Sequence, residues 1–92
     1  LKNANLRQAN LSHSKLMGTN LENANLTKAD LTHTRMTKTN LKNANLKKAN
    51  LMFAELIKVN LDGADLTKAD LRHAKWIKTS WKSAIGIETI KR

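Results

Sequence analysis

The stretch LKNANLRQANLSHSKLMGTN (residues 1–20) repeats with a period of five, because a leucine opens each group of five residues. A helix advances about 500° in five residues, so leucines at this spacing form no stripe along a helix. In an extended segment, residues two apart share a face, so Ala4 and Leu6 point inward while Asn5 points outward. The next small residue, Ala9, follows Leu6 by three positions, and this spacing requires a bend. The chain is therefore predicted to turn around an axis.

A second period of twenty residues gives the number of sides. LKNAN at 1–5 recurs as LENAN at 21–25, LKNAN at 41–45 and LDGAD at 61–65. Four groups of five then complete one coil, and each residue lies above its partner twenty positions earlier. At about 4.8 Å between neighbouring strands, the 92 residues make about 4.5 coils and a rod of about 22 Å.

These repeats resemble the pentapeptide-repeat family, whose signature A-(D/N)-L-x-x occurs in nearly every unit from residue 1 to about 84. The resemblance implies an all-β fold, a right-handed quadrilateral β-helix with four pentapeptides per 20-residue coil. It also implies a protein without catalytic activity. One branch of the family inhibits gyrase by imitating DNA with an acidic rod, a role that the net charge of +10 disfavours here. The residues that depart from the signature are Lys15, Arg35, Glu55, Lys75 and Ser80 at the Asn/Asp slot, and Trp76 and Trp81 at the Leu slot.

The inward residues define the predicted core and its two ends. We predict a core stack that includes Leu21, Leu41, Leu61, Leu26, Leu46, Leu66, Trp76 and Trp81. We assign residues 1–84 to the β-helix and residues 85–92 to a C-terminal capping tail, in which Ile85, Ile87 and Ile90 fold over the core. The N-terminal end shows no cap, and its unpaired backbone edges invite association. We expect a further segment or a second copy stacked on this end.

Charge and composition limit the classes of function. Seventeen Lys and Arg oppose seven Asp and Glu, which predicts solubility and attraction to anionic partners. Cysteine is absent, so disulfides and thiolate metal sites are excluded. No apolar run approaches the ~18 residues of a membrane span, and we expect a soluble, cytoplasmic protein. The outward cations form columns that are candidate anion-binding residues: Lys28, Lys48, Lys68, Lys38, Lys58, Lys78, Lys15, Arg35 and Lys75.

Two further outward columns need an interpretation. His13, His33 and His73 share a column with Phe53, and without a third ligand in register we predict no metal site and no cofactor. The apolar residues predicted to face outward are Met52, Phe53, Ile57 and Ile77. They are explained either by packing of the tail or of a neighbouring molecule, or by a protein-binding patch. No catalytic residues recur at a workable spacing.

The sequence therefore predicts a non-catalytic module that presents a rigid basic rod to another protein. The alternative is a binder of nucleic acid or an anionic surface that acts through the lysine columns. The lack of Tyr, the single Phe and the inward tryptophans argue against base stacking.

Overall fold

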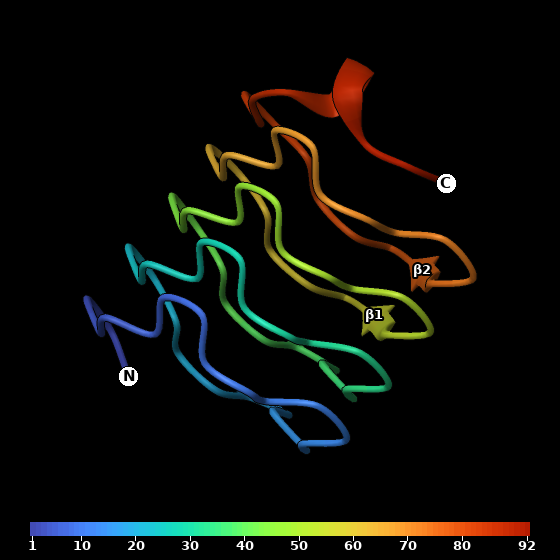
Figure 1. Ribbon diagram of the computed structural model, residues 1–92. Coiled ribbons are helices and arrows are strands. Elements are labelled where there is room, and N and C mark those ends of the chain that lie inside the picture. Colours follow the sequence, from blue (N-terminus) through green and yellow to red (C-terminus); the bar gives the residue numbers. More distant parts are fainter.

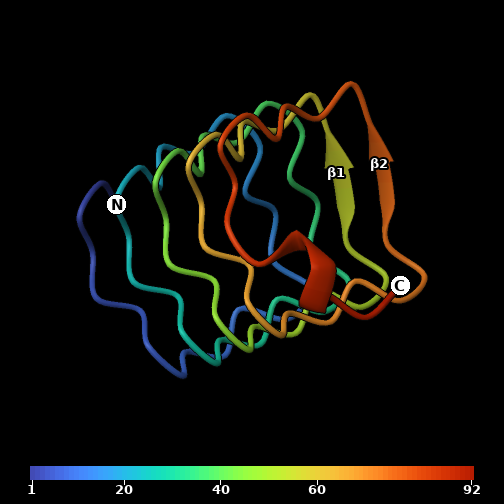
Figure 2. The same cartoon turned by 90° about the horizontal axis from the view of Figure 1, so that it is seen from above.

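The computed structural model describes all residues 1–92, and the chain winds into a stack of similar coils (Figure 1). Parallel bridges join residues twenty positions apart, as in Asn5 with Asn25, Asn25 with Asn45, and Asn45 with Asp65. Figure 2 shows the layers following one another from the N-terminus to the C-terminus. The predicted twenty-residue period is confirmed. The overall extents of 27 × 24 × 22 Å make the molecule a short block rather than a long rod.

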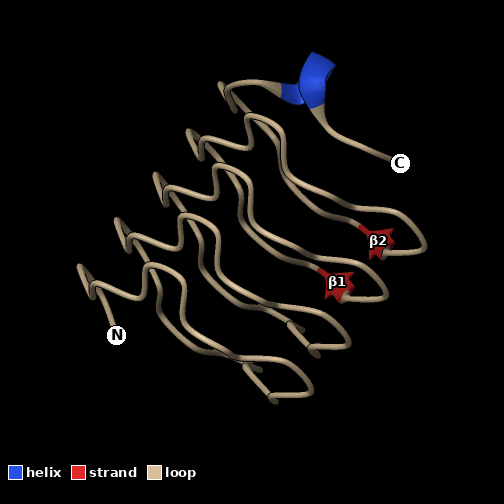
Figure 3. Ribbon diagram, viewed as in Figure 1, coloured by secondary structure: helices blue, strands red, loops and turns tan.

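Each coil contains four two-residue corners, which in the first layer lie at residues 2–3, 7–8, 12–13 and 17–18. We call them the first to fourth corners, and each recurs twenty residues later. The only continuous strands, β1 (Glu55–Ile57) and β2 (Lys75–Ile77), lie on the same side of the coil in neighbouring layers and pair in parallel (Figure 3). The other segments contact the next layer through single bridges.

The backbone of each unit bonds to the layers on both sides and to its own corner. The N–H of Leu26 donates to the carbonyl of Asn45 at 2.7 Å, and the N–H of Asn25 donates to the carbonyl of Ala4 at 2.9 Å. Ala29 closes its corner by donating to the carbonyl of Leu26 at 3.0 Å. The residue before it, Lys28, has φ 59°, so the corner is a type II turn. This left-handed residue recurs at the third position of the units.

The Asn/Asp slot is explained by a second hydrogen bond at the corner. The Oδ1 atom of Asn25 accepts the backbone N–H of Thr27 at 3.1 Å and its hydroxyl at 2.7 Å. Such Asx turns fix the chain where it enters a corner. They recur at Asn5, Asn10, Asn20, Asp30, Asn40, Asn45, Asn50, Asn60, Asp65 and Asp70.

The core consists of four columns of large apolar residues, most of them leucines, together with small residues from the neighbouring inward positions. Leu21, Leu26, Leu41, Leu46 and the layers above them are at most 1% exposed as far as Leu71. Each fully buried leucine contributes about 1.5–3 kcal/mol before entropy is counted. The four core columns are continuous, so each layer buries its neighbours and the outermost layers stay partly open.

The C-terminal end differs from the predicted cap. Ile85 bridges Asp65, twenty residues earlier, but Lys91 bridges Asp70, twenty-one residues earlier. One extra residue, near Gly86, thus enters the coil just before the helical turn η1 (Ile87–Thr89). The tail continues the coil over the second corner, above residues 65–70, instead of folding over the core.

This course of the tail decides where its isoleucines lie. Ile87 and Ile90 pack against the core, while Ile85 is 56% exposed, so the prediction that Ile85 covers the core is wrong. Its bridge with Asp65 places it in the outward Asn/Asp slot. Trp76 lies above Leu56 as predicted, yet it is 37% exposed because no layer covers it.

The insertion generates a prediction about Gly86, which has φ 77°. A Cβ built there would lie 2.6 Å from the Cα of Thr67 and 2.7 Å from its nitrogen, so Gly86→Ala must displace backbone. Gly18 has φ 66° with open space around it, so Gly18→Ala carries only the penalty of the left-handed conformation, about 1–2 kcal/mol. We expect Gly86→Ala to lower the free energy of unfolding by a further ~1–3 kcal/mol, measured by urea unfolding. Equal losses would contradict the close approach of the tail.

Candidate interaction surface

On one side of the coil, the slot that holds Asn or Asp elsewhere holds another residue in every layer. Lys15, Arg35, Glu55 and Lys75 occupy it and are stacked by parallel pairing, Lys15 with Arg35, Arg35 with Glu55, and Glu55 with Lys75. None of them accepts the N–H of an entering corner, so the fourth corner has no Asx turn. The departures from the repeat therefore change the structure of one corner and free its outward positions for charged side chains.

At the inner slot of this corner, threonine hydroxyls form hydrogen bonds that replace those of the missing Asx turn. The corner bond lengthens from 3.1 Å at Thr19 to 3.4 Å at Thr39 and is not formed at Val59 or Thr79. Instead, the hydroxyls of Thr39 and Thr79 donate to carbonyls of the layer before them, those of Leu16 and Leu56. The hydroxyls of Thr39 and Thr79 thus tie the fourth corner to the neighbouring layer.

Outside this corner lies a column of three apolar residues and one threonine, which we call the ridge: Met17, Thr37, Ile57 and Ile77. Met17 is 54% exposed and Ile77 44% exposed, and Ile57 and Ile77 are direct neighbours in the β1–β2 pair. Following the chain around the coil, the ridge has one column of cations before it and one after it. These flanking cations are Lys15, Arg35 and Lys75 on one side and Lys38, Lys58 and Lys78 on the other.

None of the flanking cations has an acidic partner within 4 Å. The three ion pairs of the structure join Lys2 with Glu22, Lys47 with Asp65, and Arg72 with Asp70, all away from the ridge. Glu55, the only acid in the flanking columns, forms no ion pair either. The other predicted ladder, Lys28, Lys48 and Lys68, is likewise unpaired and lies on the second corner, opposite the ridge. The two ladders therefore cannot contact one flat ligand together.

The third corner carries a stack of aromatic rings, which we call the ring column: His13, His33, Phe53 and His73. Successive ring centroids are 4.7, 4.9 and 4.9 Å apart, with interplanar angles of 3°, 0° and 13°. Two Zn–N bonds of about 2.0–2.1 Å span less than this separation, and the nitrogen lone pairs lie in parallel planes. In this arrangement neighbouring histidines do not chelate one ion.

The predicted apolar patch falls on two separate corners. Met52 and Phe53 lie on the third corner, whereas Ile57 and Ile77 lie on the fourth. Phe53 is 46% exposed, but His33 and His73 cover both of its faces, so only its edge reaches solvent. The Sδ atom of Met52 lies 3.8 Å from an Arg72 guanidinium nitrogen. Sequence reasoning grouped these residues correctly as outward-facing but missed the internal stacking.

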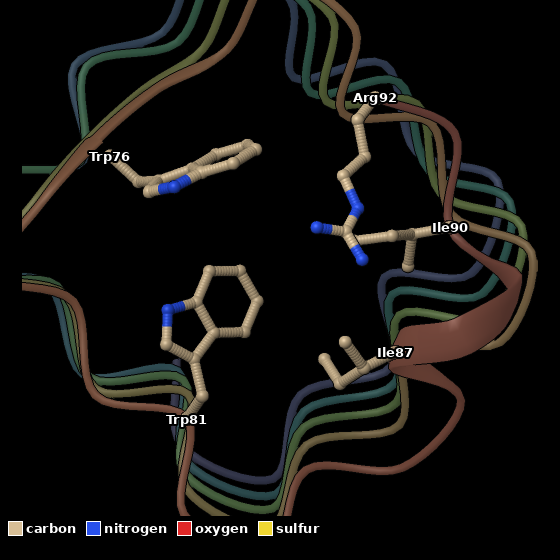
Figure 4. Close-up of a pocket in the computed structure, with 5 residues that line it drawn as sticks. All are labelled: Trp76, Trp81, Ile87, Ile90 and Arg92. Carbon is tan, nitrogen blue, oxygen red and sulfur yellow. The ribbon is translucent and has the colours of Figure 1, made fainter.

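A pocket lies at the C-terminal end of the core. Figure 4 shows Trp76 and Trp81 facing Ile87, Ile90 and Arg92 across the open end of the core. The indoles meet edge to face with centroids 6.0 Å apart. The lining offers no nucleophile or general base, so the pocket supplies apolar contact without acid–base chemistry.

Hydrogen bonds hold the pKa of several carboxyl groups below the usual range. The hydroxyl and N–H of Thr32 lower the pKa of Asp30, and the Arg72 side chain lowers that of Asp70. For Asp65, burial raises the pKa, but the hydrogen bonds from Thr67 outweigh it, so the net pKa is lowered. These aspartates stay ionised in their Asx turns, and Asp30 and Asp70 leave the third corner closer to electrical neutrality than the fourth.

The sequence profile of the pentapeptide repeats matches residues 4–43 and 34–72, with eight copies. This chain belongs to the pentapeptide-repeat family. No curated protein sequence matches it, and the structure contains no helix of the length and apolar character that a membrane span requires.

Three solved structures of pentapeptide-repeat type are similar to the chain. HetL from the cyanobacterium Nostoc sp. strain PCC 7120, involved in heterocyst differentiation regulation, is 28% identical with a TM-score of 0.50, over 96% of this chain and 48% of HetL. QnrB1, a plasmid-mediated fluoroquinolone resistance protein, is 18% identical with a TM-score of 0.52, over 89% of this chain and 55% of QnrB1. A protein from the Arabidopsis thaliana thylakoid lumen is 22% identical with a TM-score of 0.49, over 90% and 61%. The chain thus spans about half to three fifths of these relatives.

The lowered carboxyl pKa values predict how stability depends on pH. Because folding lowers them below the unfolded value of about 3.9, the unfolded chain binds more protons in acid, so stability is lost as pH falls below about 4. Replacing Asp30, Asp65 and Asp70 together by Asn keeps the Asx acceptor, since Asn fills this slot in other layers. We expect the triple variant to lose less stability between pH 6 and pH 3 than the unmodified chain in urea unfolding. An identical loss would show that these groups do not carry the pH dependence.

Proposed function

We propose that this chain is a non-catalytic module that presents a rigid basic surface to a protein partner. We infer a right-handed quadrilateral coil, as the family implies. The observation that carries the functional proposal is the ridge on the fourth corner, where Ile57 and Ile77 are paired and Met17 and Ile77 are about half exposed. Contiguous exposed apolar side chains on an otherwise polar surface are typical of protein-interaction sites.

Rigidity supports the same proposal. The ridge lies on backbone that is bonded to the neighbouring layers, as in the 2.8 Å bond from the Lys58 N–H to the carbonyl of Ile77. Side chains on such a support lose little freedom on binding, which favours affinity. The one pocket lacks a nucleophile and a general base, which favours binding over catalysis.

The test compares two charge-matched variants in capture of partners from the source cells. Ile57→Asp with Ile77→Asp places two charges on the ridge, and we expect at least tenfold less partner to be retained. Gln8→Asp with Ser83→Asp adds the same two charges at exposed left-handed positions elsewhere, which Asp tolerates, and should retain the partner. Circular dichroism checks that both remain folded. Undiminished capture by the ridge variant would contradict the proposal that the partner binds at the ridge.

A second candidate function rests on the unpaired cations. Neither lysine ladder has an acidic partner within 4 Å, so both are available to a polyanion such as nucleic acid or an anionic surface. Phosphate contacts release counterions, so binding to a random DNA duplex should weaken by orders of magnitude between about 50 and 200 mM salt. Fluorescence anisotropy at the two salt concentrations measures this, and no binding at the lower one would exclude the polyanion.

A further inference from the structure

The ridge and its flanking cations together indicate the chemistry of a complementary surface on a partner. We propose that the ridge (Met17, Thr37, Ile57, Ile77) docks into an apolar groove on a partner protein and that carboxylates line both rims of that groove. This inference rests on the proposed function and specifies the chemistry of the partner. It concerns the fourth corner alone and leaves the ring column and the second corner outside the contact.

The shape of the corner indicates a concave partner. Met17 and Thr37 lie in the turn of the fourth corner, Ile57 and Ile77 end strands β1 and β2 at the same corner, and the side chains of Met17 and Ile77 are about half exposed. Neighbouring layers are separated by about the 4.7–4.9 Å seen between rings of the ring column. The ridge is therefore a continuous row of side chains, and a groove covers more of such a row than a flat surface does.

The charges indicate acidic rims. Lys15, Arg35 and Lys75 precede the ridge in its layers, and Lys38, Lys58 and Lys78 follow it. These six cations have no acidic partner within 4 Å, and Glu55 is the only acid among them. Like charges repeated in neighbouring layers repel one another, and carboxylates placed along both sides would relieve this repulsion. An apolar centre with charged edges is also the usual arrangement of a protein interface.

A second copy of the chain does not offer this groove. Glu22, Asp65 and Asp70 pair with cations, and Asp30 and Asp62 accept hydrogen bonds. Of the seven acids this leaves only Glu55 and Glu88, which are too few to line both rims of a groove. Nucleic acid fits less well, because Phe53 and His33 have both ring faces covered and offer no platform to bases. The centre of the surface is also apolar, where a polyanion would need cations.

The first step of the test locates the contact on the partner. A photo-cross-linking phenylalanine analogue replaces Thr37 within the ridge of the full chain, and a matched variant carries it at Thr27, the same turn slot on the opposite corner. After irradiation in extracts of the source cells, mass spectrometry identifies the residue that is cross-linked. Capture alone does not count as support. We expect adducts only from position 37, on apolar residues that Asp and Glu flank. Adducts on nucleic acid, equal adducts from position 27, or none from position 37 would overturn the inference.

The second step measures rates with the purified partner. Lys38, Lys58 and Lys78 are replaced together by Gln, which should slow association at least tenfold at low salt and flatten its salt dependence. Ile57→Ser with Ile77→Ser should instead speed dissociation at least tenfold with little change in association. If only the isoleucine variant loses affinity, the proposed protein-binding function stands and the acid-rimmed groove is wrong. If neither variant changes the rates, both fall.

Discussion

The hydrogen bonds between layers, repeated in a register of twenty residues, are the interaction on which the structure depends. The N–H of Asn25 donates to the carbonyl of Ala4 in the layer before it, and Asn25 pairs with Asn45 in the layer after it. Because this register recurs along the chain, outward residues twenty positions apart become neighbours in a column. A residue type that recurs at this interval therefore becomes a stripe. The stacked rings, the lysine ladders and the contact of Ile57 with Ile77 all follow from the register and would not exist if the layers slipped.

Much of this architecture could be predicted from the sequence, because both periods are direct consequences of backbone geometry. The five-residue spacing separated inward from outward residues, and the twenty-residue spacing placed units above one another. The left-handed third residue of each unit was missed, since Lys28 and Phe53 rarely adopt positive φ and conceal the pattern that Gly18 and Gly63 reveal. The extra residue near Gly86 was missed because it shifts the register of the tail while Ile87 and Ile90 keep the apolar inner pattern.

The candidate site could be predicted only in its parts. The sequence showed basic residues at the Asn/Asp slot of one side and bulkier residues at its inner slot, but it could not show that these changes are linked. In the structure, the fourth corner loses its Asx turn, and Thr39 and Thr79 bond to the previous layer instead. Phe53 was placed in the apolar patch because sequence cannot show that histidines cover its faces. One corner thus departs from the local turn pattern and gains an apolar ridge between cations.

The register itself can be tested with cysteines, because the chain has none of its own. Thr27 and Lys47 are twenty residues apart in neighbouring layers of the second corner, where the Lys28 N–H donates to the carbonyl of Lys47 at 2.9 Å. The usual spacing of about 4.8 Å between neighbouring strands lies within the Cα–Cα range of disulfides. Thr27 and Thr37 are nearer in sequence but lie on opposite corners of one coil. On mild oxidation, the Thr27→Cys, Lys47→Cys variant should form an intramolecular disulfide, and the Thr27→Cys, Thr37→Cys variant should keep free thiols, as counted by thiol titration. A disulfide in the second variant and none in the first would contradict the stacked coil.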